Sequence, residues 1–281
     1  MFGVVPKSIW NKLNPSDENN LCNWAMRSLL IEDGNKLILI DNGIGDKQDA
    51  KFFSHYYLNG DDSLDKSLAA KGFHRDDITD VILTHLHFDH CGGSIIKQGD
   101  KLVTAFKNAT YWSNETHWQW ATIPNDREKA SFLKENILPI QESGQLKFVA
   151  GGKQAAIASG EQPLERINSE IISSLSFLFV NGHTGAMMLP VIDMGAKTLV
   201  YMADLLPAAA HIPLPYVMGY DMFPLTTLYE KKSFLNEALS KDYILFFEHD
   251  PVNECCTLEK TERGIRQKDC FLLKEIITPI P

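Results

Sequence analysis

The 281-residue sequence is poor in cysteine, contains no long apolar run and has no cluster of basic residues. Its five cysteines are an odd number without a repeated spacing, which argues against a disulfide framework and favours a reducing compartment. The first 20 residues contain no continuous apolar core of the length that a secretory signal needs. No stretch approaches the roughly 20 apolar residues of a membrane span. These absences predict a cytoplasmic protein with free thiols and no membrane partner.

The balance of charge excludes another class of partner. The formal net charge is -9 at pH 7, from 27 basic and 36 acidic residues. Binding to nucleic-acid phosphates needs a basic face, and no run of lysine or arginine supplies one. With 44% hydrophobic and 22% charged residues, the chain can bury a large core. We therefore predict one large α/β domain over residues 1–281 that binds no nucleic acid.

The most informative segment is residues 84–93, Thr-His-Leu-His-Phe-Asp-His-Cys-Gly-Gly. It follows an apolar run at 78–83 that is typical of a buried strand, and open α/β sheets hold ligands beyond the carboxyl ends of their strands. Imidazole nitrogens together with a carboxylate suit zinc or iron. A solvated polar loop would explain a single histidine, but not this spacing after a strand. The candidate ligands are His85 and His87, which can reach one ion, and Asp89 and His90, which can face a second.

This segment resembles the hallmark motif of the metallo-β-lactamase superfamily of hydrolases. Later segments supply the family's remaining ligands in the expected order: residues 181–185 resemble the loop of the third histidine, 201–204 the strand of the bridging aspartate, and 246–250 the last histidine strand. The resemblance implies two divalent metal ions, for which nitrogen and oxygen ligands favour zinc. The implied ligands are His85, His87 and His183 on one ion, Asp89, His90 and His249 on the other, and Asp204 as the bridge.

Two parts of the chain repeat the same order of elements. Residues 28–41 predict a β-hairpin around an Asp-Gly turn, and a strand that ends in His85 follows. Residues 187–204 predict a second hairpin, and a strand that ends in His249 follows. The repetition predicts two similar β-rich halves stacked face to face with helices outside, an αββα sandwich, which the resemblance also implies. The strand ends and the metals would then share one edge.

Helical spacing or capping residues mark residues 64–71, 113–120, 126–138 and 226–240. The segment at about 113–140 is interpreted as a helical insertion over the metal cleft or at a subunit contact, which leaves a homodimer open. The tail, residues 258–281, is predicted to be a charged segment followed by an apolar strand or helix.

Three side chains near the motif have a structural alternative. Asp41, at the end of the first hairpin, is a turn former or helix cap on sequence alone, whereas the resemblance implies that it orients a ligand histidine. His117 is interpreted as a surface helix residue, because the ligand positions are already filled. Cys91 is interpreted as a buried small residue, since a hydroxide on the metal would make a thiol nucleophile unnecessary.

Two adjacent dications would explain the number of ligands. A metal ion lowers the pKa of bound water toward about 7, and a second ion stabilises the developing oxyanion. Asp89 is the candidate proton shuttle to the leaving group. The apolar, proline-rich residues 205–218 follow Asp204 and predict a cleft for a small, neutral and partly hydrophobic substrate. His211 is the one polar side chain we single out there, either as a catalytic substrate contact or as a packed histidine.

Within the superfamily the chain is most similar to the branch of quorum-quenching N-acyl-homoserine lactonases and related organophosphate and aryl-ester hydrolases. This resemblance implies opening of a lactone or ester. Many of those lactonases carry a tyrosine three residues after the bridging aspartate; Pro207 stands there in this chain, which leaves carbonyl polarisation to the metal, His211 or Tyr216. The alternatives are an arylesterase or phosphotriester hydrolase, and a glyoxalase-like thioester hydrolase, for whose charged ligand we find no basic cluster.

Overall fold

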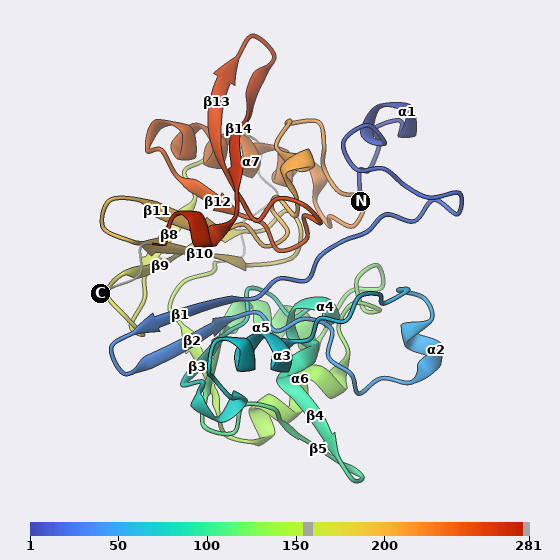
Figure 1. Ribbon diagram of the computed structural model, residues 1–281, viewed down its shortest axis with the longest axis vertical. Helices are drawn as coiled ribbons and strands as arrows, with labels where there is room; N and C mark the ends of the chain where they lie inside the picture. Colours follow the sequence, from blue (N-terminus) through green and yellow to red (C-terminus); the bar gives the residue numbers. More distant parts are fainter. Residues whose placement is uncertain (154–159, 278–281) are drawn as a thin grey trace. The chain divides into compact units, whose positions relative to one another are not determined.

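The computed structural model describes residues 1–153 and 160–277, and the chain forms two compact units (Figure 1). The motif unit is Met26–Val149, and the aspartate unit combines Met1–Ala25 with Ala150–Pro281. Two units agree with the two halves expected from the sequence, whereas a single hydrolase domain over residues 1–281 stays a prediction. Within the described residues, no helix has the length and apolar character to cross a membrane.

The motif unit is built on a five-stranded sheet. Its strands, in sheet order, are β1 (Leu29–Asp33), β2 (Lys36–Ile40), β3 (Asp80–Ile82), β6 (Thr110–Asn114) and β7 (Leu146–Val149). A separate hairpin consists of β4 (Ile95–Gln98) and β5 (Lys101–Thr104). The helices are α2 (Ala50–Phe53), α3 (Leu64–Ala70), α4 (Phe88–Cys91), α5 (Glu115–Thr122) and α6 (Lys134–Glu142), and the short 3₁₀ helices are Arg75–Asp77 and Gly92–Ser94.

Alternating apolar side chains bury one face of this sheet under the helices. Leu39, Val81 and Tyr111, from three neighbouring strands, share one core with Ile137 and Ile140 of α6, and all five side chains are buried. The burial of this apolar surface is the main stabilising term for the unit. It fixes the end of β3, after which the histidine motif follows.

The aspartate unit is built on a seven-stranded sheet. Its strands, in sheet order, are β14 (Gly264–Phe271), β13 (Cys255–Thr261), β12 (Ile244–Phe246), β11 (Thr198–Tyr201), β10 (Met187–Asp193), β9 (Leu175–Val180) and β8 (Glu165–Asn168). The long helix α7 (Pro224–Ser240) packs against β13 and β14, as Figure 1 shows. The unit also contains α1 (Lys7–Trp10) and the 3₁₀ helices Ala209–His211 and Leu273–Glu275.

The repetition predicted from the sequence is present in the strand pairing. In the motif unit β1 pairs antiparallel with β2, which pairs parallel with β3; in the aspartate unit β10 pairs antiparallel with β11, which pairs parallel with β12. The residues that follow β2 and β11 make equivalent hydrogen bonds to the neighbouring parallel strand. The Asp41 N–H donates to the Ile82 carbonyl at 2.9 Å, and the Met202 N–H donates to the Phe246 carbonyl at 3.0 Å. Each unit therefore presents its candidate ligands where two parallel strands end.

Two predicted elements differ from the structure. The second helix of the 113–140 segment begins at Lys134 rather than at residue 126, because the Asn125 side chain accepts from the N–H groups of Arg127 and Glu128 and forms a turn there. In the tail, the predicted charged segment forms the antiparallel hairpin of β13 and β14, and the apolar part after it contains the end of β14 and the short 3₁₀ helix Leu273–Glu275. Residues 278–281 of the predicted tail lie outside the described residues.

Gly182 is required where the 181–183 loop meets the start of α7. A Cβ atom at this position would lie 2.2 Å from the Thr227 hydroxyl oxygen and 2.3 Å from the Thr227 nitrogen. We expect Gly182→Ala to lower the free energy of unfolding by about 1–3 kcal/mol, since backbone must move to relieve the overlap. Urea denaturation measures this.

The matched control is Gly219→Ala, because a Cβ there would meet only the Gly3 Cα at 3.7 Å, an ordinary contact. We expect it to change stability by less than about 0.5 kcal/mol. Equal denaturation midpoints for Gly182→Ala and the unsubstituted protein would contradict the close approach of this loop to α7.

Candidate metal centre

In the motif unit, the rings of His85 and His87 converge. The Nε2 atom of His85 lies 3.1 Å from the Nδ1 atom of His87. Nδ1 of His85 contacts the Thr84 hydroxyl oxygen at 3.1 Å, and Nε2 of His87 contacts a Glu128 carboxylate oxygen at 2.9 Å. When these outer nitrogens carry the protons, the two inner nitrogens turn lone pairs toward each other. A cation between them removes that repulsion, and the spacing suits two ligands of one zinc ion.

Buried acceptors fix the orientation of two motif histidines. Glu128 contacts His87 and also accepts from the Trp120 indole N–H at 2.7 Å. Asp41 contacts Nδ1 of His90 at 3.1 Å and accepts from the Thr84 N–H and hydroxyl at 2.8 and 2.7 Å. Asp41 therefore contacts a histidine of the motif, as the resemblance implies, whereas the role of His90 as a metal ligand stays a prediction. Such partners fix which ring nitrogen faces a metal.

His117 is buried, so the prediction of a surface residue was wrong. Its Nε2 atom accepts from the Leu86 N–H at 2.8 Å, which ties α5 to the backbone between the two converging histidines. The Asn114 side chain caps the start of this helix by accepting from the His117 N–H. The buried side chains of the helix are His117, Trp118 and Ala121. His117 therefore supports the motif instead of lying on the surface.

In the aspartate unit, one carboxylate faces two imidazoles. The Oδ2 atom of Asp204 lies 3.1 Å from Nε2 of His183, and its Oδ1 atom lies 3.3 Å from Nε2 of His249. The three residues come from a loop after β9, the end of β11 and the segment after β12. A carboxylate that offers one oxygen to each of two neighbouring groups has the arrangement of a bridging metal ligand.

The other nitrogens of these two rings are also held. Nδ1 of His183 lies 2.9 Å from an oxygen of Asp221, and Nδ1 of His249 donates to the Ala25 carbonyl at 2.8 Å. Burial lowers the pKa of His183, but Asp204 and Asp221 outweigh that effect and raise it to about 10. The pair of carboxylates therefore favours a positive charge at this ring, either a proton or a metal ion.

Two adjacent charged residues of α7 support loops of the aspartate unit and were missed in the sequence. Glu230 accepts from the N–H groups of Asn181 and Gly182 at 2.6 and 2.9 Å, directly before His183. Lys231 is fully buried, and its ammonium group donates at 2.9 to 3.3 Å to the carbonyl oxygens of Pro213, Leu214 and Tyr216. The sequence feature that could have identified them is a pair of opposite charges beside the apolar residues of the helix predicted over residues 226–240.

Cys91 and His211, for which the sequence left a catalytic role as one interpretation, are both buried. Cys91 is buried, as predicted, and burial raises the pKa of its thiol to about 12, which disfavours the thiolate. His211 stacks on Phe2 at 4.6 Å between ring centroids, with Nε2 3.3 Å from the Met1 carbonyl oxygen. Burial, aided by Lys231, lowers the pKa of His211 to about 3, so the ring is neutral at pH 7. These contacts describe a packed histidine, and its catalytic role stays a prediction.

Each unit thus carries part of the predicted ligand set: His85, His87, Asp89 and His90 in one, and His183, Asp204 and His249 in the other. Five imidazoles and two carboxylates form a nitrogen and oxygen donor set that suits zinc and related divalent ions. The held outer nitrogens and the facing inner atoms fit metal ligands better than solvated side chains. The residues present therefore fit the implied metals.

Comparison with solved structures supports this fold. A "probable metal-dependent hydrolase" from Staphylococcus aureus is 24% identical over 97% of this chain and 92% of its own, with a TM-score of 0.81. AidC, a dizinc quorum-quenching lactonase, is 23% identical over 89% of this chain and 81% of its own, with a TM-score of 0.70. A mutant of AiiA from B. thuringiensis is 20% identical over 82% of this chain and 83% of its own, with a TM-score of 0.59.

No curated protein sequence matches the chain. The family model of the metallo-beta-lactamase superfamily matches residues 27–249, which span both units and all seven predicted ligands. The matched segment runs from before the first hairpin to the last predicted ligand histidine. The chain therefore belongs to the metallo-beta-lactamase superfamily of metal-dependent hydrolases.

Proposed function

We propose that the two partial ligand sets combine into one binuclear metal centre, with which the protein opens a lactone or an ester. The observation that carries this proposal is the set of held histidines. His87, His90, His183 and His249 each have one ring nitrogen at an acceptor, and the inner nitrogens of His87, His183 and His249 face another candidate ligand. One ion would be held by His85, His87 and His183, the other by Asp89, His90 and His249, with Asp204 shared.

The bound ions would supply activation of water and polarisation of the substrate carbonyl. Asp89 has the chemistry for the proton transfers: as a carboxylate it takes the proton that water loses, and as the acid it returns that proton to the leaving oxygen. His211 is a poor source of this proton, because its pKa of about 3 leaves it neutral at pH 7. Asp41 and Glu128 hold His90 and His87 in position while the charge develops.

Residues 205–218 are our candidate for the wall that binds substrate. Leu205, Leu206 and Ile212 anchor this segment in the core, Leu214, Tyr216 and Val217 remain partly exposed, and Lys231 holds the carbonyls of its second half. An apolar wall of this kind suits a neutral substrate with a short acyl chain, so we favour an N-acyl-homoserine lactone. The protein would act in the cytoplasm on a diffusible small molecule.

An arylesterase or phosphotriester hydrolase is the second candidate, and Pro207 is the observation that favours it. The Pro207 carbonyl accepts from the His249 N–H at 3.1 Å, and its side chain offers no hydroxyl to a lactone carbonyl. Aryl esters and phosphotriesters have better leaving groups and depend less on such a donor.

The assay compares hydrolysis of N-hexanoyl-homoserine lactone, p-nitrophenyl acetate and paraoxon by the zinc-loaded protein. We expect kcat/KM to be highest for the lactone, to fall at least about 100-fold after chelation, and to return with zinc, because water activation depends on the ions. Turnover of only the ester or paraoxon would transfer the function to the second candidate, and turnover that survives complete metal removal would contradict both.

A matched pair of variants ties the activity to the proposed ligands. We expect His183→Asn to lose activity and one metal ion per chain, whereas His74→Asn, on an exposed residue of the motif unit, keeps both. Elemental analysis and the same assay measure these results. Equal loss in both variants would point to general instability instead of metal binding.

Glu128 provides a test that leaves every proposed ligand in place. Replacing it by Gln removes the charge at Nε2 of His87 but keeps the shape, and we expect metal affinity to fall about 10–100-fold, as partners behind ligand histidines typically contribute. Competition with a chromogenic chelator measures the affinity. The exposed Glu115→Gln should leave it unchanged, and unchanged affinity in Glu128→Gln would refute the orienting role.

A further inference from the structure

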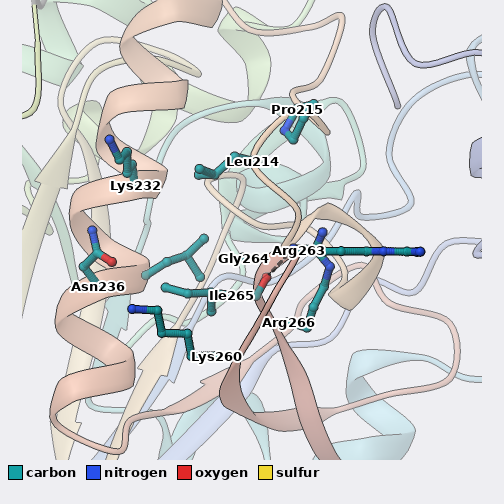
Figure 2. A pocket seen from close by; sticks show the side chains of 10 residues that line it. Leu214, Pro215, Lys232, Asn236, Lys260, Arg263, Gly264, Ile265 and Arg266 are labelled. Atoms are coloured by element: carbon teal, nitrogen blue, oxygen red, sulfur yellow. Dashed lines mark hydrogen bonds between the residues drawn. The ribbon is translucent and has the colours of Figure 1, made fainter.

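A pocket lies in the aspartate unit, between α7 and the hairpin of β13 and β14. Its volume is about 440 Å³, within the range of small-molecule sites (Figure 2). Leu214, Leu235 and Ile265 form its apolar lining, and Leu235 is fully buried. None of the proposed metal ligands lines it.

The charged side chains around this pocket are all positive. Lys232 from α7 and Lys260 and Arg266 from the hairpin line it, and Figure 2 shows them around the apolar side chains; Arg263 also lines it, but its side chain extends away. Among the described residues that line the pocket, none is acidic. In a protein with a net charge of -9, a pocket whose charged lining residues are all basic favours an anionic ligand.

The existing partners of these cations leave capacity for a ligand. Lys232 pairs with Glu161, but both side chains are almost half exposed, so water screens that pair. Arg266 donates one N–H to the Ile265 carbonyl at 2.6 Å, which uses one of its five donors. Arginine binds carboxylates with two parallel hydrogen bonds, and lysine adds a point charge.

We propose that this pocket binds a small amphipathic carboxylate. Its carboxylate would lie between Lys232 of α7 and Lys260, which shares a face of the hairpin with Ile265, and its apolar chain would pack on Leu214, Leu235 and Ile265. A purely polar anion such as inorganic phosphate would leave that apolar lining in contact with water, whereas a neutral hydrocarbon would make no use of the cations. Basic and apolar lining residues together therefore favour a ligand that carries both a carboxylate and an apolar chain.

The pocket is connected to the loop that we assign to the substrate. Leu214 and Pro215 line the pocket and lie in the segment whose carbonyls Lys231 holds. A ring-opened N-acyl-homoserine is itself an amphipathic carboxylate, whereas the intact lactone is neutral. This link to the product rests on the proposed function, but binding of a carboxylate in the pocket does not.

The experiment measures octanoate and N-hexanoylhomoserine binding to the metal-loaded protein at low salt, by calorimetry and by methyl NMR of Leu214, Leu235 and Ile265. We expect octanoate to bind at least 10-fold more tightly than acetate and to shift these methyl signals. Lys232→Gln combined with Lys260→Gln should weaken octanoate binding at least 10-fold and leave metal content unchanged. Lys268→Gln combined with Lys274→Gln, at exposed positions of the same C-terminal part, is the control with the same loss of charge.

Octanoate binding that is equal in the two double variants, or methyl signals that do not shift, would overturn the proposal, since a carboxylate could then be held by the metal ions alone. Tight binding of N-hexanoylhomoserine with weak binding of octanoate would assign the pocket to the product, and equal binding would assign it to alkyl carboxylates in general. A protein that binds octanoate here but hydrolyses no lactone would keep this proposal and refute the proposed function.

Discussion

The proposed metal centre depends on hydrogen bonds that hold the outer nitrogens of four candidate ligand histidines. A neutral imidazole has one N–H and one lone pair, so an acceptor that takes the N–H leaves the lone pair on the opposite side of the ring. Glu128, Asp41, Asp221 and the Ala25 carbonyl act as these acceptors for His87, His90, His183 and His249. Without them the rings could rotate, and the inner nitrogens would not be positioned for the same ions.

Two charged side chains of α7, Glu230 and Lys231, are buried in the aspartate unit, and hydrogen bonds to the backbone offset the free energy lost on burying them. Glu230 and Lys231 are neighbours on α7, and burial moves the pKa of each to about 7, upward for the carboxyl and downward for the ammonium group. Glu230 accepts two N–H groups and Lys231 contacts three carbonyls, bonds that are worth about 1.5–3 kcal/mol each when one partner is charged. One helix thereby stabilises both the loop before His183 and the loop after His211.

The sequence predicted what is local or periodic. The Asp-Gly turn, the alternation of apolar residues and the strand before His85 identified the hairpins, the parallel strands and the repeated order of the two units, and the motif with its later segments led to the family. The roles of Glu128 and His117 were not predictable, because Glu128 lies 41 residues from its partner His87 and His117 lies 31 residues from Leu86. Such pairs carry no spacing that a motif could record.

The pocket between α7 and the hairpin of β13 and β14 was also not predictable from the sequence. Lys232 lies on a helix and Lys260 and Arg266 lie on a hairpin, so the sequence contains no basic run and indicates no basic cluster for a charged ligand. The antiparallel pairing of β13 with β14 places Lys260 opposite Ile265 on one face of the hairpin, and the packing of α7 on this hairpin adds Lys232. Charge distribution in the folded chain therefore differs from the charge pattern along the sequence.

The central claim is that seven ligands from two units hold two ions, and anomalous diffraction from crystals of the zinc-loaded protein tests it most directly. The account predicts two zinc peaks about 3.5–4 Å apart, the spacing of two-metal sites. Asp204 should lie between them, with His85, His87 and His183 at one peak and Asp89, His90 and His249 at the other. A single peak, or peaks bound by residues of only one unit, would contradict the account.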